Sequence, residues 1–306
     1  MAALTQVRPF TLFSDEVWGR LTRRSSWRGV FLVLHAWALI AAASAMVAIW
    51  PNPLTWVLAV MIVGGRQLGL AILMHEASHG TLHPNRRVND FVGEYLCAAP
   101  VSADLVRYRP YHLTHHRFTQ QDEDPDLGLS RPFPTTRASL RRKIIRDLTG
   151  QTFFKQRIKP LLKPGAAGQG FIGDTAGATR RFLAAWAVLF LIYWACGAPL
   201  EFVTVWLVAF VTWYPLVTRI RNIAEHACTS REPNPYTVAR TTKANWLERL
   251  FIAPYFVQYH AEHHLFIAVP CYRLPALHAE LAQLGMTQGM NIASGYRSVL
   301  LDVLVG

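Results

Sequence analysis

Charged residues are scarce in this sequence. Only 16% of its 306 residues are Asp, Glu, Lys or Arg, whereas about a quarter of the residues in a soluble domain are charged. Hydrophobic residues make up 52% of the chain. This composition excludes an ordinary soluble domain and predicts an integral membrane protein.

Acidic residues and cysteines are also few. The 19 acidic residues leave a net charge of +12, but the basic residues flank long apolar runs and no nucleic-acid-binding motif accompanies them. Anionic lipid headgroups are therefore the predicted partner, and nucleic acid is not. The four cysteines form no C-x-x-C pair and no spacing typical of a disulfide framework, so we expect them to be reduced.

Long apolar runs are present instead. Four of them can cross the roughly 30 Å hydrocarbon layer as helices, at about residues 30–50, 53–74, 182–198 and 200–217. The connections WPNPL and CGAPLE contain no Lys or Arg, whereas arginines cluster at the opposite ends of the runs. The positive-inside rule then predicts that the cytoplasm contains both termini, residues 85–179 and residues 218–306.

These observations define the predicted fold class. We expect an all-α integral membrane protein of a single domain, residues 1–306, with four transmembrane helices in two hairpins. A cytoplasmic helical cap carries the histidine clusters. Arg66 lies inside the second span, where an unpaired charge is costly, so its side chain should face the interior and meet either an internal partner or a polar group of the substrate.

Eight of the twelve histidines fall in three tight clusters, all on the cytoplasmic side of this topology. Side chains three or four residues apart share one face of a helix, while neighbours differ by about 100° of rotation. One cluster can therefore reach two metal ions that lie side by side. The clusters are HEASH with His75 and His79, HLTHH with His112, His115 and His116, and HAEHH with His260, His263 and His264.

The first cluster also matches H-E-x-x-H, the zinc protease motif in which the glutamate, here Glu76, acts as general base. A catalytic zinc ion needs only three protein ligands, which would leave most of the grouped histidines without a role. The number of histidines favours two metal ions, with Glu76 orienting a ligand imidazole. Imidazole suits Fe, Zn, Cu and Ni, so the ligand type does not identify the metal.

The order H-x-x-x-H, H-x-x-H-H, H-x-x-H-H around two apolar pairs resembles the membrane fatty acid desaturase and hydroxylase superfamily, of the bacterial type. The stretches HLTHHRFTQQDEDPDLGL and YHAEHHLFIAVPCYRLPALH carry the likeness, which extends from the second span to about His278. It implies a centre of two Fe ions that uses dioxygen and two electrons to remove hydrogens from an alkyl chain. The electrons would come from an external donor, such as a ferredoxin or a cytochrome b5 type protein. Glu76 stands where many acyl-lipid members have Asp, and His260 stands where front-end desaturases have Gln.

A ninth ligand has two candidates. Gly80 and Pro84 predict that the helix ends before His83, so the direction of that imidazole is undetermined. His226 follows the fourth span, with Asn222 on the same helical face. The resemblance implies a histidine at this place, preceded by an asparagine that can hold a metal-bound water, so we expect His226 to be the ligand and Asn222 its outer partner.

The full set of expected site residues follows from these arguments. Acidic residues in DEDPDL, which are Asp122, Asp124 and Asp126, could accept N–H groups from ligand imidazoles or form a solvated turn. The expected supporting residues are Glu76, Asn222 and Asp126. The expected metal ligands are His75, His79, His112, His115, His116, His226, His260, His263 and His264.

The leading functional hypothesis is a di-iron desaturase that acts on a fatty acyl chain, on a lipid or another acyl carrier, in a bacterial inner membrane. A hydroxylase, ketolase or decarboxylase of the same superfamily is the alternative, with an alkyl, carotenoid or small amphipathic substrate. An intramembrane zinc protease and a non-catalytic metal- or lipid-binding protein are more distant alternatives. The histidine clusters do not distinguish among the reactions of the superfamily.

Overall fold

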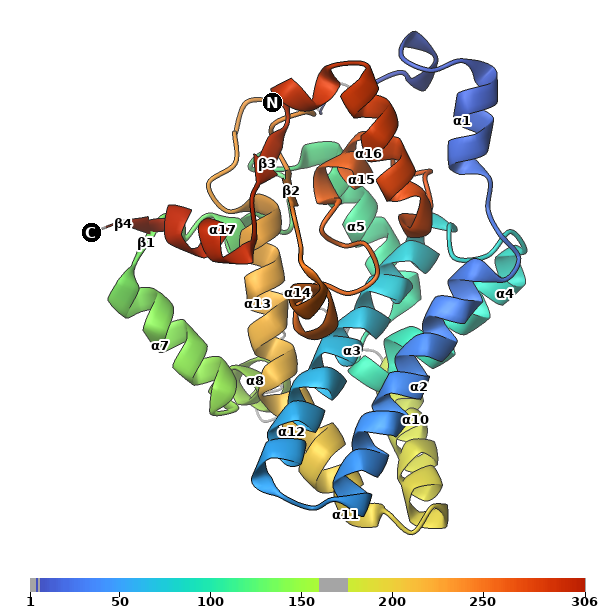
Figure 1. The fold of residues 1–306 in the computed structure, drawn as a ribbon, viewed down its shortest axis with the longest axis vertical. Helices are drawn as coiled ribbons and strands as arrows, with labels where there is room; N and C mark the ends of the chain where they lie inside the picture. The colour runs from blue at the N-terminus through green and yellow to red at the C-terminus, as the bar shows by residue number, and fades with distance from the viewer. Residues whose placement is uncertain (1–3, 5, 160–175, 306) are drawn as a thin grey trace.

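The computed structural model describes residues 4, 6–159 and 176–305 and is mostly helical (Figure 1). Within that part of the chain, four helices are long and apolar enough to cross a membrane, in agreement with the four predicted spans. They are Arg28–Ile49, Pro53–His79, Gly177–Ala195 and Pro199–His226. The cytoplasmic segment predicted at residues 85–179 includes residues 160–175, which lie outside the described residues.

The first two spans are α2 (Arg28–Ile49) and α3 (Pro53–His79), and only three residues join them. Asn52 begins α3 with a capping box, because its side chain accepts hydrogen bonds from the backbone of Leu54 and Thr55 and the Thr55 hydroxyl accepts one in return. The helix continues five residues beyond the predicted end at 74, until Gly80 takes a left-handed conformation with φ 71°. The first histidine cluster therefore lies on the last turn of α3 itself.

The third span, α10 (Ala176–Ala195), begins earlier and ends earlier than the predicted 182–198. The fourth span is a chain of helical segments that reaches His226, nine residues beyond its predicted end. Arg219 and Arg221, which indicated the end of the span by their charge, are paired with Asp147 and Glu225 inside the fold. The segments are α11 (Pro199–Glu201), π-helical η5 (Phe202–Leu207), α12 (Val208–Val211) and α13 (Trp213–His226).

The remaining elements gather mostly around the ends of α3 and α13 (Figure 1). Before α2 lie η1 (Pro9–Thr11) and α1 (Asp15–Thr22). Between α3 and α10 lie α4 (Arg86–Phe91), η2 (Val92–Ala98), η3 (Ala99–Val101), α5 (Leu105–Phe118), α6 (Leu127–Ser130), β1 (Thr135–Thr136), α7 (Arg137–Leu148), α8 (Gln151–Phe153) and η4 (Phe154–Ile158). After α13 lie β2 (Arg240–Thr242), α14 (Trp246–Phe251), α15 (His260–Leu265), η6 (Cys271–Arg273), α16 (Leu274–Gln283), η7 (Met286–Gly289), β3 (Asn291–Ala293), α17 (Tyr296–Asp302) and β4 (Leu304–Val305).

Two short parallel strand pairs interrupt the predicted all-α architecture. Strand β1 pairs with β4, with Thr135 opposite Leu304, and β2 pairs with β3, with Arg240 opposite Asn291. Each strand has only two or three residues, too few for a recognisable alternation of polar and apolar side chains. Both pairs connect segments that are far apart in the chain, so they fasten the C-terminal region to the rest of the fold.

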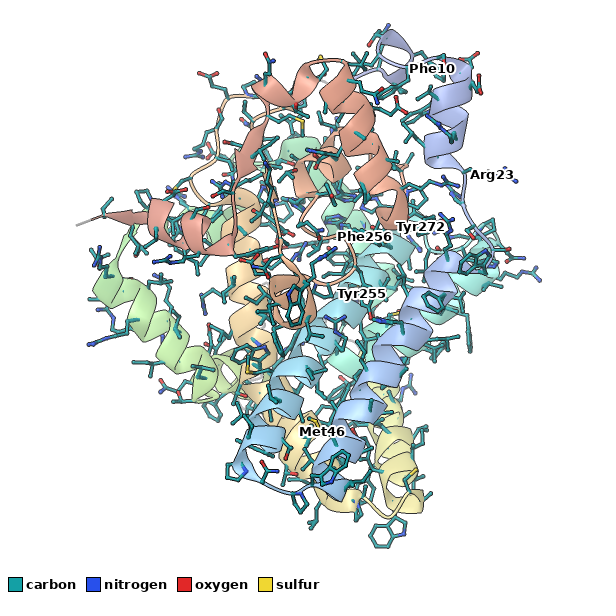
Figure 2. The ribbon with its side chains drawn as sticks, in the orientation of Figure 1. Phe10, Arg23, Met46, Tyr255, Phe256 and Tyr272 are labelled. Atoms are coloured by element: carbon teal, nitrogen blue, oxygen red, sulfur yellow. The ribbon has the colours of Figure 1, made fainter. Side chains whose placement is uncertain are left out.

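Helix α3 lies at the centre of the packing. Glycines on its surface allow close approach, since a Cβ atom at Gly64 would lie 2.7 Å from the Cβ of Trp213. Arg66 is buried and donates hydrogen bonds to the backbone oxygens of Arg249 and Leu250, at 3.0 and 2.7 Å. Its guanidinium also lies over the ring of Tyr255, where the C-terminal segment meets the long helices (Figure 2). The partner of Arg66 is thus internal.

Candidate metal centre

Four helices bring the expected histidines together. The last turn of α3 carries His75 and His79, and α13 ends on His226. Helix α5, capped by the side chain of Asp104, carries the second cluster, and the short α15 carries the third. All nine histidines expected as ligands belong to two groups in which one ring nitrogen of each residue lies within 4.8 Å of the others.

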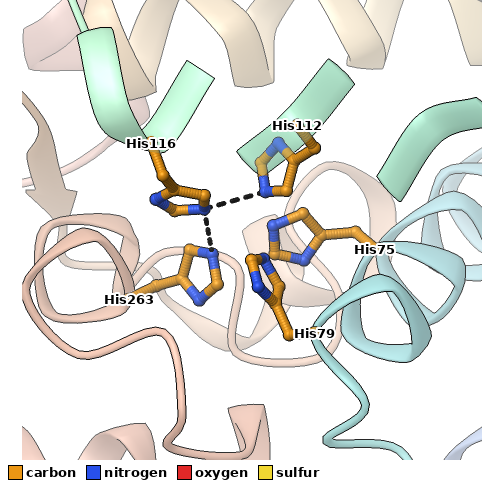
Figure 3. A group of neighbouring side chains, drawn as sticks. All are labelled: His75, His79, His112, His116 and His263. Atoms are coloured by element: carbon orange, nitrogen blue, oxygen red, sulfur yellow. Dashed lines mark hydrogen bonds between the residues drawn. The ribbon is translucent and has the colours of Figure 1, made fainter. Parts of the chain in front are cut away.

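The two groups divide the clusters between them. The five-histidine group contains His75, His79, His112, His116 and His263 (Figure 3), and the four-histidine group contains His115, His226, His260 and His264. Sequence neighbours go to different groups, as His115 and His116 do, and as His263 and His264 do. The rotation of about 100° between adjacent helical residues explains this separation. His226 lies in a group and His83 does not: the His83 ring accepts a local hydrogen bond from the Asn85 amide at 3.0 Å.

Spacings within each group fit a bound metal ion. The Nε2 atoms of His112 and His116 are 2.9 Å apart, and those of His260 and His226 are 2.8 Å apart. Two nitrogens about 2.1 Å from one ion subtend about 84 to 87° at these spacings, whereas a tetrahedral zinc ion would hold them about 3.4 Å apart. Among the described residues, the buried Nε2 atoms of His75 and His79 have no hydrogen-bond partner. Such orphaned donor atoms suit a metal ligand set.

The pKa values of the clustered imidazoles also suit metal binding. Burial, followed by the influence of neighbouring imidazoles, holds the pKa well below the ordinary histidine value in His112, His116, His260, His263 and His264. A neutral imidazole keeps a lone pair for a metal ion. An incoming metal ion would therefore meet a set of neutral nitrogen ligands rather than a cluster of cations.

The four-histidine group is oriented by protein acceptors. His115 Nδ1 lies 2.7 Å from Asp124 Oδ1, His226 Nδ1 lies 3.1 Å from the Val238 carbonyl, and His264 Nδ1 lies 3.3 Å from the Thr119 hydroxyl. His260 Nδ1 lies 3.4 Å from Glu225 Oε1. In the other group, four of the five Nδ1 atoms are buried without a partner among the described residues, those of His79, His112, His116 and His263.

His115 is the exception in its pKa. Burial lowers the pKa of this imidazole, but the hydrogen bond that it donates to Asp124 and the negative charges of Asp126 and Asp124 outweigh burial, so the pKa is raised overall. The same hydrogen bond helps to hold the pKa of Asp124 below its ordinary value, against the effect of burial. The pair fixes the proton on Nδ1, so Nε2 is the atom that faces the metal group.

The supporting residues differ partly from those expected. Asp126 Oδ2 lies 3.8 Å from His115 Nδ1, and its other oxygen accepts a hydrogen bond from the Tyr111 hydroxyl. Asp124 is the nearer acceptor, because the turn after α5 brings it back toward the ring. Asp122 is exposed and paired with Arg231. Asp124 is thus the direct acceptor of the His115 imidazole, and the expected Asp126 lies further away, within ion-pair distance of the same nitrogen.

Glu76 has a position that does not suit a protease base. One of its oxygens accepts hydrogen bonds from the Thr81 hydroxyl and the Cys271 amide, both at 2.9 Å, and the other lies 3.5 Å from His75 Nδ1. The carboxylate thus lies on the Nδ1 side of the imidazole and binds the backbone of a distant segment. Sequence reasoning did not anticipate this contact with Cys271, nor the place of Glu225 beside His260.

A cavity of about 270 Å³ adjoins the four-histidine group. His115, His226 and His260 line it, as does His112 of the five-histidine group, together with Asn222, which lies one turn before His226 on α13. Its walls are largely apolar and come from several helices, with Leu68, Ala71, Phe133, Phe153, Phe210 and Ile223. The volume is close to the lower limit for small-molecule sites.

The match to the family model described as fatty acid desaturase covers residues 51–294. The chain belongs to the fatty acid desaturase family. Among its relatives, a dihydrorhizobitoxine desaturase from Bradyrhizobium elkanii is 27% identical over 86% of this chain and 78% of the relative. A beta-carotene ketolase from Paracoccus sp. (strain PC1) is 27% identical over 80% of this chain and 86% of the relative. A zeaxanthin 4-ketolase from Chlamydomonas reinhardtii is 26% identical over 68% of this chain and 40% of the relative.

These relatives are oxidoreductases of the desaturase and ketolase class. The resemblance stated from the histidine clusters is thereby confirmed at the level of the family. The desaturase and the Paracoccus ketolase are both 27% identical to this chain, and identity at this level does not choose between the two reactions.

Proposed function

We propose that this family member is a di-iron, dioxygen-dependent desaturase that acts on a fatty acyl chain in the membrane. The observation that carries the proposal is the adjacency of two histidine groups to a cavity with largely apolar walls. An alkyl chain that occupied this cavity would lie beside the four-histidine group. A reaction at an unactivated methylene pair requires that these carbons be held close to the metal ions.

The proposed ligands are the five and the four histidines of the two groups. Two bound iron ions would supply the oxidising power, drawn from dioxygen and two electrons, that removes two hydrogen atoms from neighbouring carbons. The overall balance is R–CH2–CH2–R′ with O2, two electrons and two protons, giving R–CH=CH–R′ and two waters. The protein's part is to hold the imidazoles, through Asp124, Glu225 and backbone acceptors, and to exclude bulk water from the cavity.

We further propose that the active site and both termini face the cytoplasm of a bacterial inner membrane. The uncharged connections at Pro51 and Gly197 and the arginines at the other ends of the spans support this orientation. The electrons would come from a separate protein of the ferredoxin or cytochrome b5 type.

A second candidate reaction has specific support. The Paracoccus relative is a beta-carotene ketolase, and the same ligand set could lead either to a second hydrogen abstraction or to oxygen transfer. The products differ in mass, since desaturation removes two hydrogens and oxygenation adds oxygen. Mass spectrometry of the product therefore distinguishes desaturase from hydroxylase and ketolase.

Metal analysis and lipid analysis test the proposal together. The purified protein should contain about two irons per chain, because the two groups each offer more imidazoles than one catalytic zinc ion uses. Cells that express the chain should accumulate an unsaturated product, and cells that express the His263→Ala variant should not. A single zinc ion per chain, with activity that survives iron chelation, would refute the di-iron function.

A further inference from the structure

Charges at the two ends of the cavity are balanced differently. Near the histidines, Arg221 is paired with Glu225 at 2.6 Å, and further along α13 Arg219 is paired with Asp147. Both of these cations are thus compensated within the fold. The cavity also contains Lys143 from α7 and Arg157 from η4. Neither has a carboxylate within ion-pair distance in the part of the chain that the structure describes.

Arg157 is the more enclosed of these two unpaired cations. One guanidinium nitrogen, Nη1, donates to the Ser102 carbonyl at 2.7 Å, and no other guanidinium nitrogen has a partner among the described residues. Burial lowers the pKa of Arg157, and the nearby Tyr214 offsets this effect only in part. An arginine remains charged even so. A half-buried cation that has no counter-ion among the described residues is costly in free energy unless a bound anion compensates its charge.

Ser102 itself is held in an unusual backbone conformation. It has φ 59° and ψ 43°, the left-handed region that residues other than glycine rarely adopt. Its carbonyl and hydroxyl both face the Arg157 guanidinium. This left-handed residue ends η3 and places both of its oxygens against the Arg157 guanidinium, which fixes the position of the cation.

Arg157 and the four-histidine group lie toward opposite ends of α13. Its lining positions on α13 run from Tyr214, which lies near Arg157, to His226 in the four-histidine group. Twelve residues of α-helix extend about 18 Å. An extended alkyl chain advances about 1.25 Å per carbon, from bonds of about 1.5 Å at about 111°, so about fourteen carbons span the distance.

We propose that Arg157 binds an anionic group, carboxylate or phosphate, at one end of the substrate, so that the alkyl chain extends along α13 to the histidines. This inference rests on the proposed function, since it names the class of substrate for that same cavity. It selects an amphipathic anion over a wholly apolar hydrocarbon. The carboxylate could belong to a free acid and the phosphate to a lipid headgroup or an acyl carrier.

Direct binding measurements test the proposal without turnover. The iron-loaded full chain, in nanodiscs of phosphatidylcholine, is titrated with radiolabelled hexadecanoate, hexadecyl phosphate and methyl hexadecanoate, with empty nanodiscs subtracted. At least one anion should bind more tightly than the neutral ester, and the tighter of the two identifies the headgroup. Arg157→Gln should weaken binding of that anion about 10- to 100-fold, as expected for loss of a charge-assisted hydrogen bond, and leave the ester unchanged.

Two further variants control for folding and for general surface charge. Lys155→Gln removes an exposed cation from the same short helix, two residues away and outside the cavity, and should change none of the three affinities. Arg157→Lys keeps the charge and should retain the preference for the anion. Equal affinity of the unmodified protein for anions and ester, including no binding of either, would overturn the proposal, as would equal effects of Arg157→Gln and Lys155→Gln.

Failure of the anion site and failure of the proposed function give different experimental results. Binding of the anion that depends on Arg157, without any oxidised product after iron and reductant are supplied, would contradict the desaturase function while leaving the anion site in place. Oxidation of the neutral ester as fast as of either anion would contradict the anion site while leaving the oxidase function in place.

Discussion

Replacement of Asp124 by Asn is a sharp test of how the four-histidine group is held. The carboxylate lies 2.7 Å from His115 Nδ1, and the side chains of both residues are only 3% exposed. Asp124 also accepts hydrogen bonds from the backbone amides of Gln120 and Asp126, each at 2.8 Å. Asparagine has the same shape but no charge and only one accepting oxygen, so the charge-assisted hydrogen bond from the imidazole is lost or weakened, and one of the N–H groups that Asp124 accepts loses its acceptor.

The expected size of the effect follows from this contact. Loss of a carboxylate behind a metal-ligating histidine weakens metal binding about 10- to 100-fold, or about 1.4 to 2.8 kcal/mol. A buried hydrogen bond to a charged group gives a similar magnitude. Because Asp124 supports only the four-histidine group, the loss should fall on one of two ions, so dialysis against a chelator should reduce the iron content from about two to about one per chain.

Matched variants give this measurement its control. Asp122→Asn removes an exposed carboxylate two residues away, which is paired with Arg231, and should leave iron content and melting temperature unchanged. Asp126→Asn, 3.8 Å from His115, should have a smaller effect than Asp124→Asn. The reasoning fails if the Asp124 variant retains both irons through the same dialysis as the Asp122 variant.

Three further predictions follow from the site and the topology. His226→Ala should lose iron and product, whereas His83→Ala, whose imidazole lies outside both groups, should keep them; the opposite pattern in metal analysis would mean that the ninth ligand is misplaced. Glu76→Gln should weaken metal affinity or activity about 10- to 100-fold without affecting any proteolysis, and casein cleavage that depends on Glu76 would contradict this. Reporter fusions test the orientation, and a different pattern would rule out the proposed topology: Pro51 and Gly197 should appear outside, and Asp122 and Gly306 inside.

Local sequence patterns predicted the parts of this protein that depend on neighbouring residues. Hydropathy located the four spans, because a run of apolar side chains is read over one helix at a time. Gly80 predicted the end of α3, since only a left-handed residue was needed to stop the helix there. The helical period predicted that adjacent histidines could reach different metal ions, and in the structure they belong to different histidine groups.

The ends of the spans were less predictable. The predicted spans ended at 74 and 217, whereas the helices continue to His79 and His226, as the helical placement of the first cluster and of Asn222 with His226 had anticipated. Charged residues do not stop a helix when partners elsewhere in the fold compensate them, and Arg219 finds such a partner in Asp147, 72 residues earlier in the chain. No local signal records that pairing.

The surroundings of the histidines depended on tertiary structure alone. A stretch rich in Asp predicted an acceptor near the second cluster, but the path of the turn decided that Asp124 rather than Asp126 would meet His115. Glu225 is next to His226 in sequence, yet its oxygen lies near His260, on a different helix. Similarly, Arg157 is one of many basic residues in the sequence, and only the fold encloses it beside Ser102.

The sequence by itself determined which residues could bind metal and which helices could span the membrane, because those depend on chemical type and local period. Only the tertiary structure decided which acceptors orient the imidazoles of the four-histidine group and which cation has no counter-ion among the described residues, because those depend on distances between segments that no local pattern contains.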